Sequence, residues 1–503
     1  MAAVYSLVCW GGLTGKTVTL TIASPCVVTS TNHGLHNGTG VVFNTTGALP
    51  TGITSGTTYY ARSTAANTFN LYDTPANAIA GGATGRVATT GTQSGTHTLK
   101  SAYFLGLPDL TRWGTSGSER IYDSVVSWRA ARSTASAFDE EICEIGQDFD
   151  DKFTSDLTIN IPAAVIRITP TVAGVYTSAW HGGVYGAGYR LVKGYSYGAG
   201  LGFGTARVTV EDITIYGDNY WGDIVTIRSV MGTFQRNFVY ASSASINGLN
   251  IGGAANKTLN NVIIGIGLGI NIYGYEHAAG TCANNTIVAC NTGIKAANAY
   301  CYGWFYNNVS VGCYIENWNG TFANMQAAYN TGESTKGVPF GTNAIVSATP
   351  DNTTFVDYAG RDLRPAAGSV LIDAGAFVFD IAAEDLNLAE RPNYNNGGAE
   401  LWDVGAFEYD HGYTRPASTT VTFTGVNSGT EIRVYDKVTG TELAGIESCA
   451  TDQALTWDLS GNDTTIRLVN TAYKIKDFDY TPVVGNQSLP IQQEPDKWYS
   501  NPI

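Results

Sequence analysis

Five segments repeat one pattern in this chain of 503 residues, a polar residue followed by three β-forming residues: Asp212-Ile213-Thr214-Ile215, Asn237-Phe238-Val239-Tyr240, Asn261-Val262-Ile263-Ile264, Asn285-Thr286-Ile287-Val288 and Asn308-Val309-Ser310-Val311. Their first residues are 25, 24, 24 and 23 positions apart. A β-rich unit that recurs at about 24 residues is typical of a solenoid, whose turns bury their apolar side chains only against one another. Leucine-rich repeats of similar period need Leu at fixed offsets, which are absent here. The spacing therefore predicts a right-handed parallel β-helix, in which the leading Asn side chains form an amide ladder.

The composition agrees with an all-β chain that has many turns. Only 14% of the residues are charged, against about 25% in an average soluble protein. The charged residues that helical bundles and coiled coils use on their surfaces are therefore scarce, whereas 44% hydrophobic residues are enough to build packed cores. A net charge of −14 argues against a nucleic-acid partner. No apolar run approaches the roughly 18 residues of a membrane span, so we expect no membrane partner.

The Cys and His residues of the sequence do not have the spacing of a metal-binding motif. The eight Cys residues contain no Cys-x-x-Cys pair, so reduced and mostly buried thiols are expected instead of a disulfide framework. The six His residues also lack metal-ligand spacing. The glycine-rich run 265–269 leads into another strand, whereas a dinucleotide-binding loop needs a following helix. We therefore expect no metal and no cofactor.

The alternation of strand-like segments and turn residues predicts a separate small β-module over residues 1–105. Short Thr- and Val-rich segments alternate with turn signals such as Asn37-Gly38 and Gly81-Gly82. The module holds four basic residues and one acidic residue, in contrast to the acidic remainder. Its expected strands are Thr17–Ile22, Val41–Phe43, Thr57–Tyr60 and Thr68–Leu71.

The next segment predicts a helix. Ser116 and Glu119 match a capping box, and Tyr122, Val125 and Arg129 follow at helical spacing. A short helix at this place would cover the open end of the strand stack that follows.

Seven acidic residues then occur between positions 139 and 151. Carboxylates are hard oxygen ligands for cations, but the spacing matches no EF-hand loop. We therefore expect a solvated acidic face here. The residues are Asp139, Glu140, Glu141, Glu144, Asp148, Asp150 and Asp151.

Three stretches resemble parts of known protein families. The stretch from His33 to Tyr60 resembles a module that recurs in structural proteins of tailed phages. The motifs within 362–375 and Trp402–Tyr409 resemble the closing segment of bacterial and phage pectate-lyase-like β-helix proteins, which implies that the β-helix ends near Tyr409. Residues 421–445 resemble a β-sandwich appended to phage proteins, with expected strands at Thr419–Phe423, Glu431–Tyr435 and Thr465–Leu468.

The pattern and these resemblances together imply an all-β chain of three parts. The parts are an N-terminal attachment module (1–105), a parallel β-helix with a short capping helix (106–410), and a C-terminal β-sandwich with an extended tail (411–503).

The resemblances also imply a function, a fibre- or spike-like virion protein for host attachment or particle decoration. It would be made in the host cytoplasm without a signal peptide, because no basic residue precedes the apolar run at the N-terminus. It would assemble as a homotrimer with other virion proteins on the tail or on the head, and it would bind host surface polysaccharide in the first case.

The alternative function is that of a tailspike depolymerase, a hydrolase or lyase that cleaves host surface polysaccharide. Glycoside hydrolysis needs two carboxylates about 5–9.5 Å apart, and residues at matching positions of neighbouring coils lie about 4.8 Å apart. The candidate carboxylates are Asp218, Asp223, Glu276 and Glu316. The candidate aromatic residues for contact with a glycan or a partner are Tyr220, Trp221, Tyr275, Trp304 and Trp318.

Overall fold

The architecture is seen in a computed structural model of the chain. The residues that it describes are 3–103, 111–114, 120–133, 140–161, 163–168, 179–195, 198, 200–204, 207–218, 221–228, 231–243, 246–252, 255–272, 278–296, 301–320, 325–376, 385–387, 393–394, 400–410, 418–424, 426, 428–436, 442–446, 448, 453–458, 464–470, 473–480 and 486–490.

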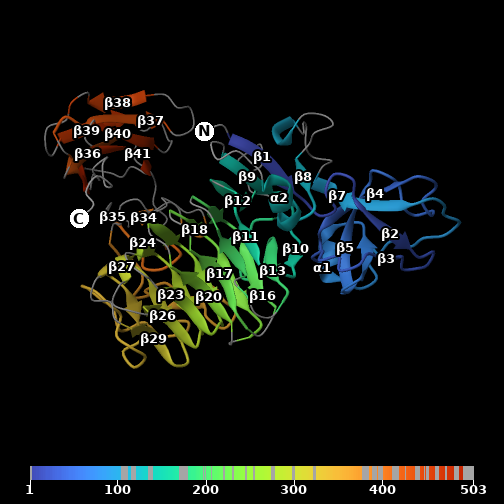
Figure 1. Ribbon diagram of the computed structural model, residues 1–503, viewed down its shortest axis with the longest axis horizontal. Coiled ribbons are helices and arrows are strands. Elements are labelled where there is room, and N and C mark those ends of the chain that lie inside the picture. Colours follow the sequence, from blue (N-terminus) through green and yellow to red (C-terminus); the bar gives the residue numbers. More distant parts are fainter. Residues whose placement is uncertain are drawn as a thin grey trace.

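Three parallel sheets wind into a β-solenoid, in which each coil adds one strand to each sheet (Figure 1). Sheet 1 contains, in spatial order, β8 (Ile121–Tyr122), β1 (Ala3–Val8), β9 (Glu140–Ile145), β12 (Ala164–Ile168), β15 (Thr209–Glu211), β18 (Thr233–Gln235), β21 (Asn256–Leu259), β24 (Ala278–Ala283), β27 (Cys301–Tyr306) and β30 (Met325–Ala328). Sheet 2 contains β10 (Asp150–Phe153), β13 (Arg190–Lys193), β16 (Thr214–Gly217), β19 (Phe238–Ala241), β22 (Val262–Ile264), β25 (Thr286–Val288), β28 (Val309–Val311) and β31 (Thr331–Gly332). Sheet 3 contains β11 (Leu157–Ile159), β14 (Leu201–Phe203), β17 (Asp223–Ile227), β20 (Asn247–Ile251), β23 (Leu268–Ile272), β26 (Thr292–Ala296) and β29 (Glu316–Gly320). The predicted parallel β-helix is confirmed.

The predicted amide ladder is present at the corner that leads into sheet 2. Asn237, Asn261, Asn285, Asn308 and Asn330 are fully buried, and each of the first four donates its Nδ2 to the Oδ1 of the next at 2.9–3.2 Å. The same Oδ1 atoms also accept backbone N–H groups of the preceding coil at 3.0–3.2 Å. The ladder therefore satisfies polar groups that the tight corner would otherwise bury without partners.

The register of the first repeat differs from the prediction by one residue. Thr214 pairs with Phe238, so Ile213 occupies the ladder position and Asp212 lies one residue before it. Asp212 has a φ of 63°, close to the 54° of Arg236, which precedes the ladder residue Asn237. The corner thus needs a left-handed residue before each ladder position, and the pattern of residue types alone did not reveal it.

Strand β1 belongs to the solenoid and not to the barrel, which corrects the assignment of residues 1–105 to one module. β1 pairs in parallel with β9 over its whole length and with β8 on its other side. A closed antiparallel barrel follows as an insertion before β8. The barrel strands, in spatial order, are β2 (Lys16–Leu20), β3 (Val27–Thr29), β6 (Thr68–Tyr72), β5 (Thr58–Ala65), β4 (Gly40–Thr45) and β7 (His97–Ser101), with helix α1 (Pro75–Ala80) beside them.

The barrel is fixed to the first coil by a small set of polar contacts. Arg190 holds Asp150 through two hydrogen bonds of 2.6 and 2.8 Å, and His36 Nε2 of the barrel lies 3.0 Å from the same carboxylate. The backbone N–H of Asp150 donates to the carbonyl of Gly34 at 2.8 Å. Although burial alone would raise the pKa of Asp150, the bonds from His36 and Arg190 hold it below its ordinary value. Barrel and solenoid thus meet through a partly buried network of charged side chains.

The predicted capping helix exists but begins later than expected. Helix α2 spans Val125–Arg132, and Ser124 is its N-cap. Ser116 and Glu119 lie outside the described residues. The side chains of Val125 and Trp128 are completely buried in the core at the first coil, so the helix covers the end of the solenoid as predicted.

The acidic segment is not a solvated face, and that prediction was wrong. Glu141, Glu144 and Asp151 are 1%, 0% and 3% exposed. Arg132 binds Glu141 through two nitrogens, whereas Glu144 accepts from Arg112, Arg167 and Trp113. The tertiary fold brings arginines from distant positions to these carboxylates, which their sequence neighbourhood could not indicate.

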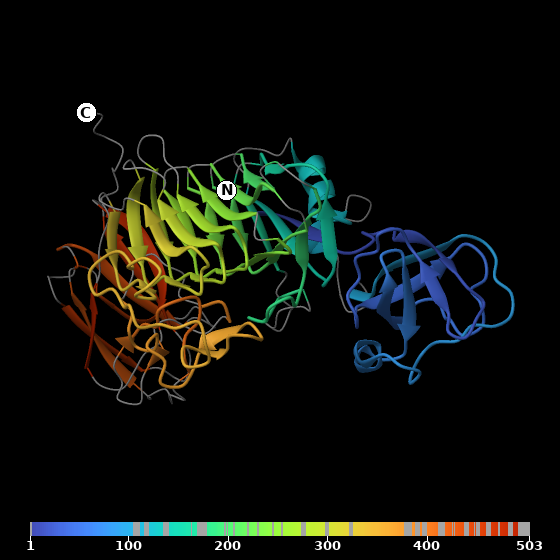
Figure 2. The ribbon, with the colours of Figure 1, turned by 90° about the horizontal axis from the view of Figure 1, so that it is seen from below.

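The segment that resembles a closing motif does not end the stack of coils. The last described parallel strands are β30 and β31, beyond which single bridges involve Thr342 and Ile345. The chain then runs along the outside of sheet 2 (Figure 2, orange). Apolar residues of this cover, which include Phe355, Leu363 and Phe407, pack against the outward side chains of sheet 2. The outer face of sheet 2 is therefore buried from β19 to β28. The cover contains β32 (Phe355–Asp357), β33 (Asp362–Pro365), β34 (Asn393–Tyr394) and β35 (Glu400–Leu401).

Two further sheets follow the cover and contain the strands expected at the C-terminus. They gather toward the end of the solenoid that lies away from the barrel (Figure 1). The first sheet has β39 (Gln453–Asp458), β36 (Ser418–Thr424) and β42 (Asn486–Pro490), and the second has β38 (Glu442–Ile446), β37 (Glu431–Asp436), β40 (Thr464–Asn470) and β41 (Tyr473–Tyr480). Part of the expected extended tail, Ser488–Pro490, belongs to β42, and the rest lies outside the described residues. No helix among the described residues is long and apolar enough to cross a membrane.

Candidate functional site

Sequence-predicted residues come together at one corner of the solenoid, between β16 and β17. The Asp218 carboxylate accepts a hydrogen bond of 2.9 Å from Lys152 Nζ, and its side chain is 42% exposed. Trp221 is 54% exposed, so most of its ring surface faces solvent. Tyr220, the third candidate of this corner, lies outside the described residues. An exposed tryptophan three residues after an ion-paired aspartate is therefore the most accessible arrangement among the described candidate residues.

A buried lysine supports this corner from inside. Lys193 is fully buried, and its Nζ donates to the carbonyl oxygens of Trp221 at 3.1 Å and Gly198 at 3.4 Å. The Tyr195 ring lies 5.0 Å from the same Nζ. Burial lowers the pKa of Lys193. The ammonium group thus ties the backbone at Trp221 to the backbone at Gly198.

Asp223 is held by neutral donors on the outer face of sheet 3. Its two carboxylate oxygens accept from Asn247 Nδ2 at 3.0 Å, Asn250 Nδ2 at 2.8 Å and Thr226 Oγ1 at 3.2 Å. Three donors from two coils occupy most of the acceptor positions of this carboxylate. Asp223 is therefore engaged in holding β17 and β20 together.

Glu316 lies in the same column of sheet 3 as Asp223, but far along it. The register runs through Asp223, Asn247, Leu268, Thr292 and Glu316. Four strand spacings of about 4.8 Å separate the two acids by about 19 Å, twice the longest distance suited to an inverting pair. Glu316 instead accepts a hydrogen bond from Asn319 Nδ2. Asp223 and Glu316 cannot share one glycosidic bond.

The candidate aromatic residues lie in different environments. Trp304 lies in β27 of sheet 1, where its Nε1 donates to Gln326 Oε1 at 3.1 Å. Trp318 lies in β29 of sheet 3 and is 4% exposed, because it continues the inward column of Leu249, Ile270 and Ile294. The prediction that Trp318 contacts a ligand was therefore wrong. Tyr275 and Glu276 lie outside the described residues.

The outer face of sheet 3 carries an amide-rich column that the sequence analysis missed. We call it the amide face: Asn250, Asn271, Lys295 and Asn319, with Asn247 in the adjoining column. Asn271 Nδ2 donates to Asn250 Oδ1 at 3.0 Å, so these two side chains are held in line across neighbouring coils. The sequence signal was present, since Asn271, Lys295 and Asn319 are 24 residues apart. The shorter step of 21 residues from Asn250 to Asn271 obscured it.

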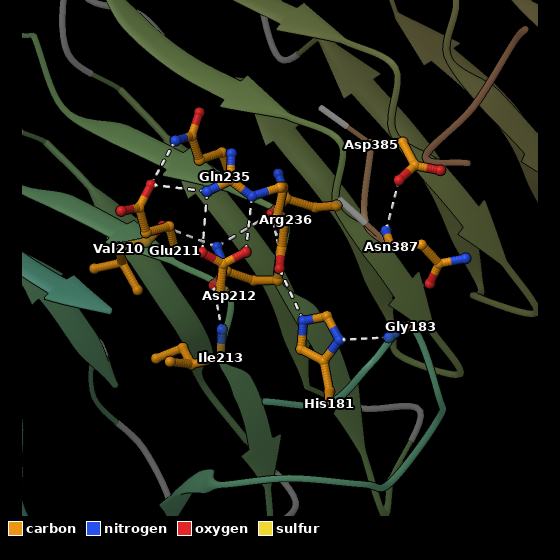
Figure 3. A network of polar contacts seen from close by, with 12 residues as sticks. His181, Gly183, Val210, Glu211, Asp212, Ile213, Gln235, Arg236, Asp385 and Asn387 are labelled. Carbon is orange, nitrogen blue, oxygen red and sulfur yellow. Dashed lines mark hydrogen bonds and ion pairs between the residues drawn. The ribbon is translucent and has the colours of Figure 1, made fainter. Parts of the chain in front are cut away.

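A second polar cluster, around Arg236, also escaped the sequence analysis (Figure 3). Arg236 binds both oxygens of Asp212 at 2.7 and 3.0 Å and reaches Glu211 at 3.2 Å. His181 Nε2 lies 3.0 Å from the Arg236 carbonyl oxygen, and its Nδ1 accepts from the N–H of Gly183 at 3.0 Å. The side chains of Arg236 and Asp212 are only 8% and 3% exposed. This cluster holds the corner of two coils and offers no exposed group to a ligand.

Neither a metal nor a known relative identifies the site. Among the described residues, no three His, Cys, Asp or Glu side chains are placed to hold a metal ion. Comparison of the sequence with protein-family models, with curated proteins and with solved structures found no match in any of the three. The chemistry of the Trp221 corner and the amide face therefore follows from their geometry alone.

Proposed function

We propose that this chain is a structural and adhesive protein of a tailed-phage particle, in which the solenoid is a rigid shaft. The observation that carries the proposal is the engagement of the candidate carboxylates in the scaffold. Asp223 accepts three hydrogen bonds from neutral side chains, and Glu316 lies about 19 Å away along the same column. Asp223 joins two coils, Glu316 accepts a hydrogen bond from Asn319 of its own strand, and the two acids are too far apart to form a hydrolytic pair.

The accessible chemistry suits adhesion to hydroxyl-rich polysaccharide. An asparagine amide both donates and accepts hydrogen bonds, as a sugar hydroxyl does. The amide face repeats such groups at the coil spacing, and Trp221 at the neighbouring corner offers an apolar ring to the C–H face of a sugar. The cover keeps this contact from most of the outer face of sheet 2, whereas the amide face lies on the outer side of sheet 3.

The alternative function, cleavage of the polysaccharide, rests on one observation. The carboxylate of Asp218 is 42% exposed and stands in the same corner as the exposed Trp221. A retaining or inverting hydrolase still needs a second carboxylate within about 9.5 Å. Asp223 would have to give up its three donors to serve as that group.

One experiment separates the two functions. The purified full chain is incubated with a panel of bacterial surface polysaccharides, and both binding and release of reducing ends are measured. Adhesion predicts binding without release, a large loss of binding in Trp221→Ala and none in the matched control Trp304→Ala, which alters sheet 1. Wild-type protein that releases reducing ends would favour the depolymerase function over adhesion if one of four substitutions abolishes that release. These substitutions are Asp218→Asn, Asp223→Asn, Glu276→Gln and Glu316→Gln.

A second measurement tests the particle context. Immunogold labelling or electron microscopy of intact phage particles with either terminus tagged would locate the protein on the tail or on the head. Sedimentation would distinguish the expected homotrimer from the 53.3 kDa monomer. Absence of the chain from purified particles would reject the virion assignment, whatever the outcome of the glycan assay.

A further inference from the structure

Two cysteines occupy equivalent positions in consecutive coils. Val288 pairs with Val311, and Cys290 and Cys313 each follow two residues later, at the corner between sheets 2 and 3. Both side chains face the core, with 1% and 2% exposure. Cys290 Sγ lies 3.5 Å from the carbonyl oxygen of Val288, and Cys313 Sγ lies 3.9 Å from that of Val311. The two thiols therefore have the same orientation, one coil apart.

The stacking brings the thiols within bonding reach. Neighbouring strands lie about 4.8 Å apart, which falls within the Cα separation of about 4.4–6.8 Å that a disulfide spans. Both are free thiols. The neighbouring Cys290 side chain lowers the pKa of Cys313, whereas burial raises the pKa of Cys290. Cys313 is thus the more readily ionised member of the pair.

We propose that Cys290 and Cys313 are a disulfide-forming pair that links two consecutive coils when a peroxide oxidises the protein. The Cys313 thiolate attacks one oxygen of hydrogen peroxide, the O–O bond breaks, and the released hydroxide takes up a proton to become water. The sulfur of Cys290 then attacks the resulting sulfenic acid, an S–S bond forms, and the S–OH oxygen leaves as a second water with the thiol proton. Two thiols lose two electrons and two protons, and one peroxide is reduced to two waters.

Two other cysteines of the described solenoid strands, Cys143 and Cys282, have no thiol at the facing register positions and serve as controls. Cys143 pairs in register with Ser6 and Ile166. Cys282 pairs with Thr258 on one side and Phe305 on the other. Cys282 is also buried, at 3% exposure, so it resembles the pair in environment and differs in its neighbours. Cys282→Ser is therefore the control for Cys290→Ser.

The test uses the full reduced chain, treated with hydrogen peroxide and then denatured for thiol titration. We expect a decrease from eight to six thiols and full recovery after dithiothreitol. Trypsin cleaves after Lys295, between the two cysteines, so a peptide map without reductant should contain the peptide 258–295 joined to the peptide 296–336. The joined species should persist in Cys282→Ser and disappear in Cys290→Ser. In Cys290→Ser, Cys313 should stop at the sulfenic acid, which dimedone traps.

The outcomes do not depend on the proposed function, because neither thiol belongs to the Trp221 corner or the amide face. Oxidised wild-type protein should also unfold at a higher temperature than reduced protein, with the difference lost in Cys290→Ser. Retention of eight thiols in peroxide-treated wild type, or a joined peptide in Cys290→Ser, would overturn the proposal. If Cys290→Ser does not fold, the wild-type peptide map decides, since fragmentation of the joined species identifies the linked cysteines.

Discussion

The side-chain amide of Asn261 donates to Oδ1 of Asn285, one coil further along the solenoid, at 3.0 Å. The same oxygen accepts the backbone N–H of Asn261 at 3.1 Å. Asn285 in turn donates to the carbonyl of Thr258 at 2.8 Å and to Oδ1 of Asn308 at 2.9 Å. One buried side chain therefore joins the coil before it to the coil after it, and the stability of neighbouring coils is coupled through it.

Replacement of a ladder residue should destabilise the solenoid strongly. Asn285→Ala removes the acceptor of the Asn261 amide groups and leaves buried donors and acceptors without partners, so we expect a loss of about 3 kcal/mol in unfolding free energy. Asn319→Ala, on the amide face, is the control and should cost less than about 1 kcal/mol. Chemical denaturation measures both. Equal losses in the two variants would show that the ladder has no special role.

Protonation of Asp151 should stabilise the fold in mild acid. Burial raises the pKa of Asp151 from 3.8 to about 6, although the N–H of Val125 and the hydroxyl of Tyr189 donate to it at 2.6 and 2.8 Å. Between these pH values the folded chain binds more protons than the unfolded chain, so this contribution to stability decreases as the pH rises from about 4 to about 6, by roughly 3 kcal/mol. Asp151→Asn should remove the decrease. Urea unfolding at pH 4–7 measures it, with Asp218→Asn as an exposed control.

His181 should act in the opposite direction over the same range. Burial lowers its pKa from 6.5 to about 4, and a proton on Nδ1 would break the bond that this atom accepts from Gly183. The unfolded chain then binds more protons, so this contribution to stability decreases as the pH falls from about 6.5 to about 4. The two effects partly cancel in the wild type. His181→Gln should leave stability that falls as the pH rises, and Asp151→Asn the reverse. Parallel pH profiles for both variants would refute this assignment.

Replacement of Asp223 should lower the free energy of unfolding. Asp223→Ala leaves Asn247, Asn250 and Thr226 without their common acceptor, and we expect a loss of about 1–2 kcal/mol. Asp218→Ala breaks only the exposed pair with Lys152 and should change stability by less than about 1 kcal/mol. Thermal or chemical unfolding compares the two. A larger effect from Asp218→Ala would contradict the structural role of Asp223.

The orientation of the barrel should depend on Asp150. Asp150→Ala removes the carboxylate that contacts both His36 and Arg190, so the barrel should become more mobile relative to the shaft. Small-angle X-ray scattering should report a larger radius of gyration, and limited proteolysis should cut faster near the junction. Asp362→Ala, which breaks a surface pair with Arg364 in the cover, is the control. Unchanged scattering in Asp150→Ala would show that the remaining contacts, such as the backbone bond from Asp150 to Gly34, are enough to fix the barrel.

The sequence predicted the solenoid well because its signal is local and repeated. Each Asn at the start of a repeat has the same chemical environment as the Asn one coil later. The structural role of one such position can therefore be extended to the equivalent position of every coil. The barrel strands and the C-terminal strands were also found, since short alternating segments with turn residues define strands locally. Asp212 was placed one residue out of register, because a polar residue with positive φ resembles a ladder residue in sequence.

The candidate site was predicted only in part. Asp218 and Trp221 lie in one exposed corner, and their closeness in the chain made that predictable. The burial of Trp318 was not, because an aromatic residue in a solenoid can face either way and only the strand register decides which. The distance between Asp223 and Glu316 was also not predicted, because it depends on the strand register and on the number of coils between the two residues.

By itself the sequence determined the parallel β-helix, its period and the asparagine ladder, because these follow from a pattern that neighbouring coils repeat. Only the tertiary structure decided that β1 belongs to the solenoid, that arginines neutralise Glu141 and Glu144, and that the segment after β31 covers sheet 2. Those contacts join residues far apart in the chain. Their partners are selected by the shape of the folded surface, and no local spacing encodes that shape.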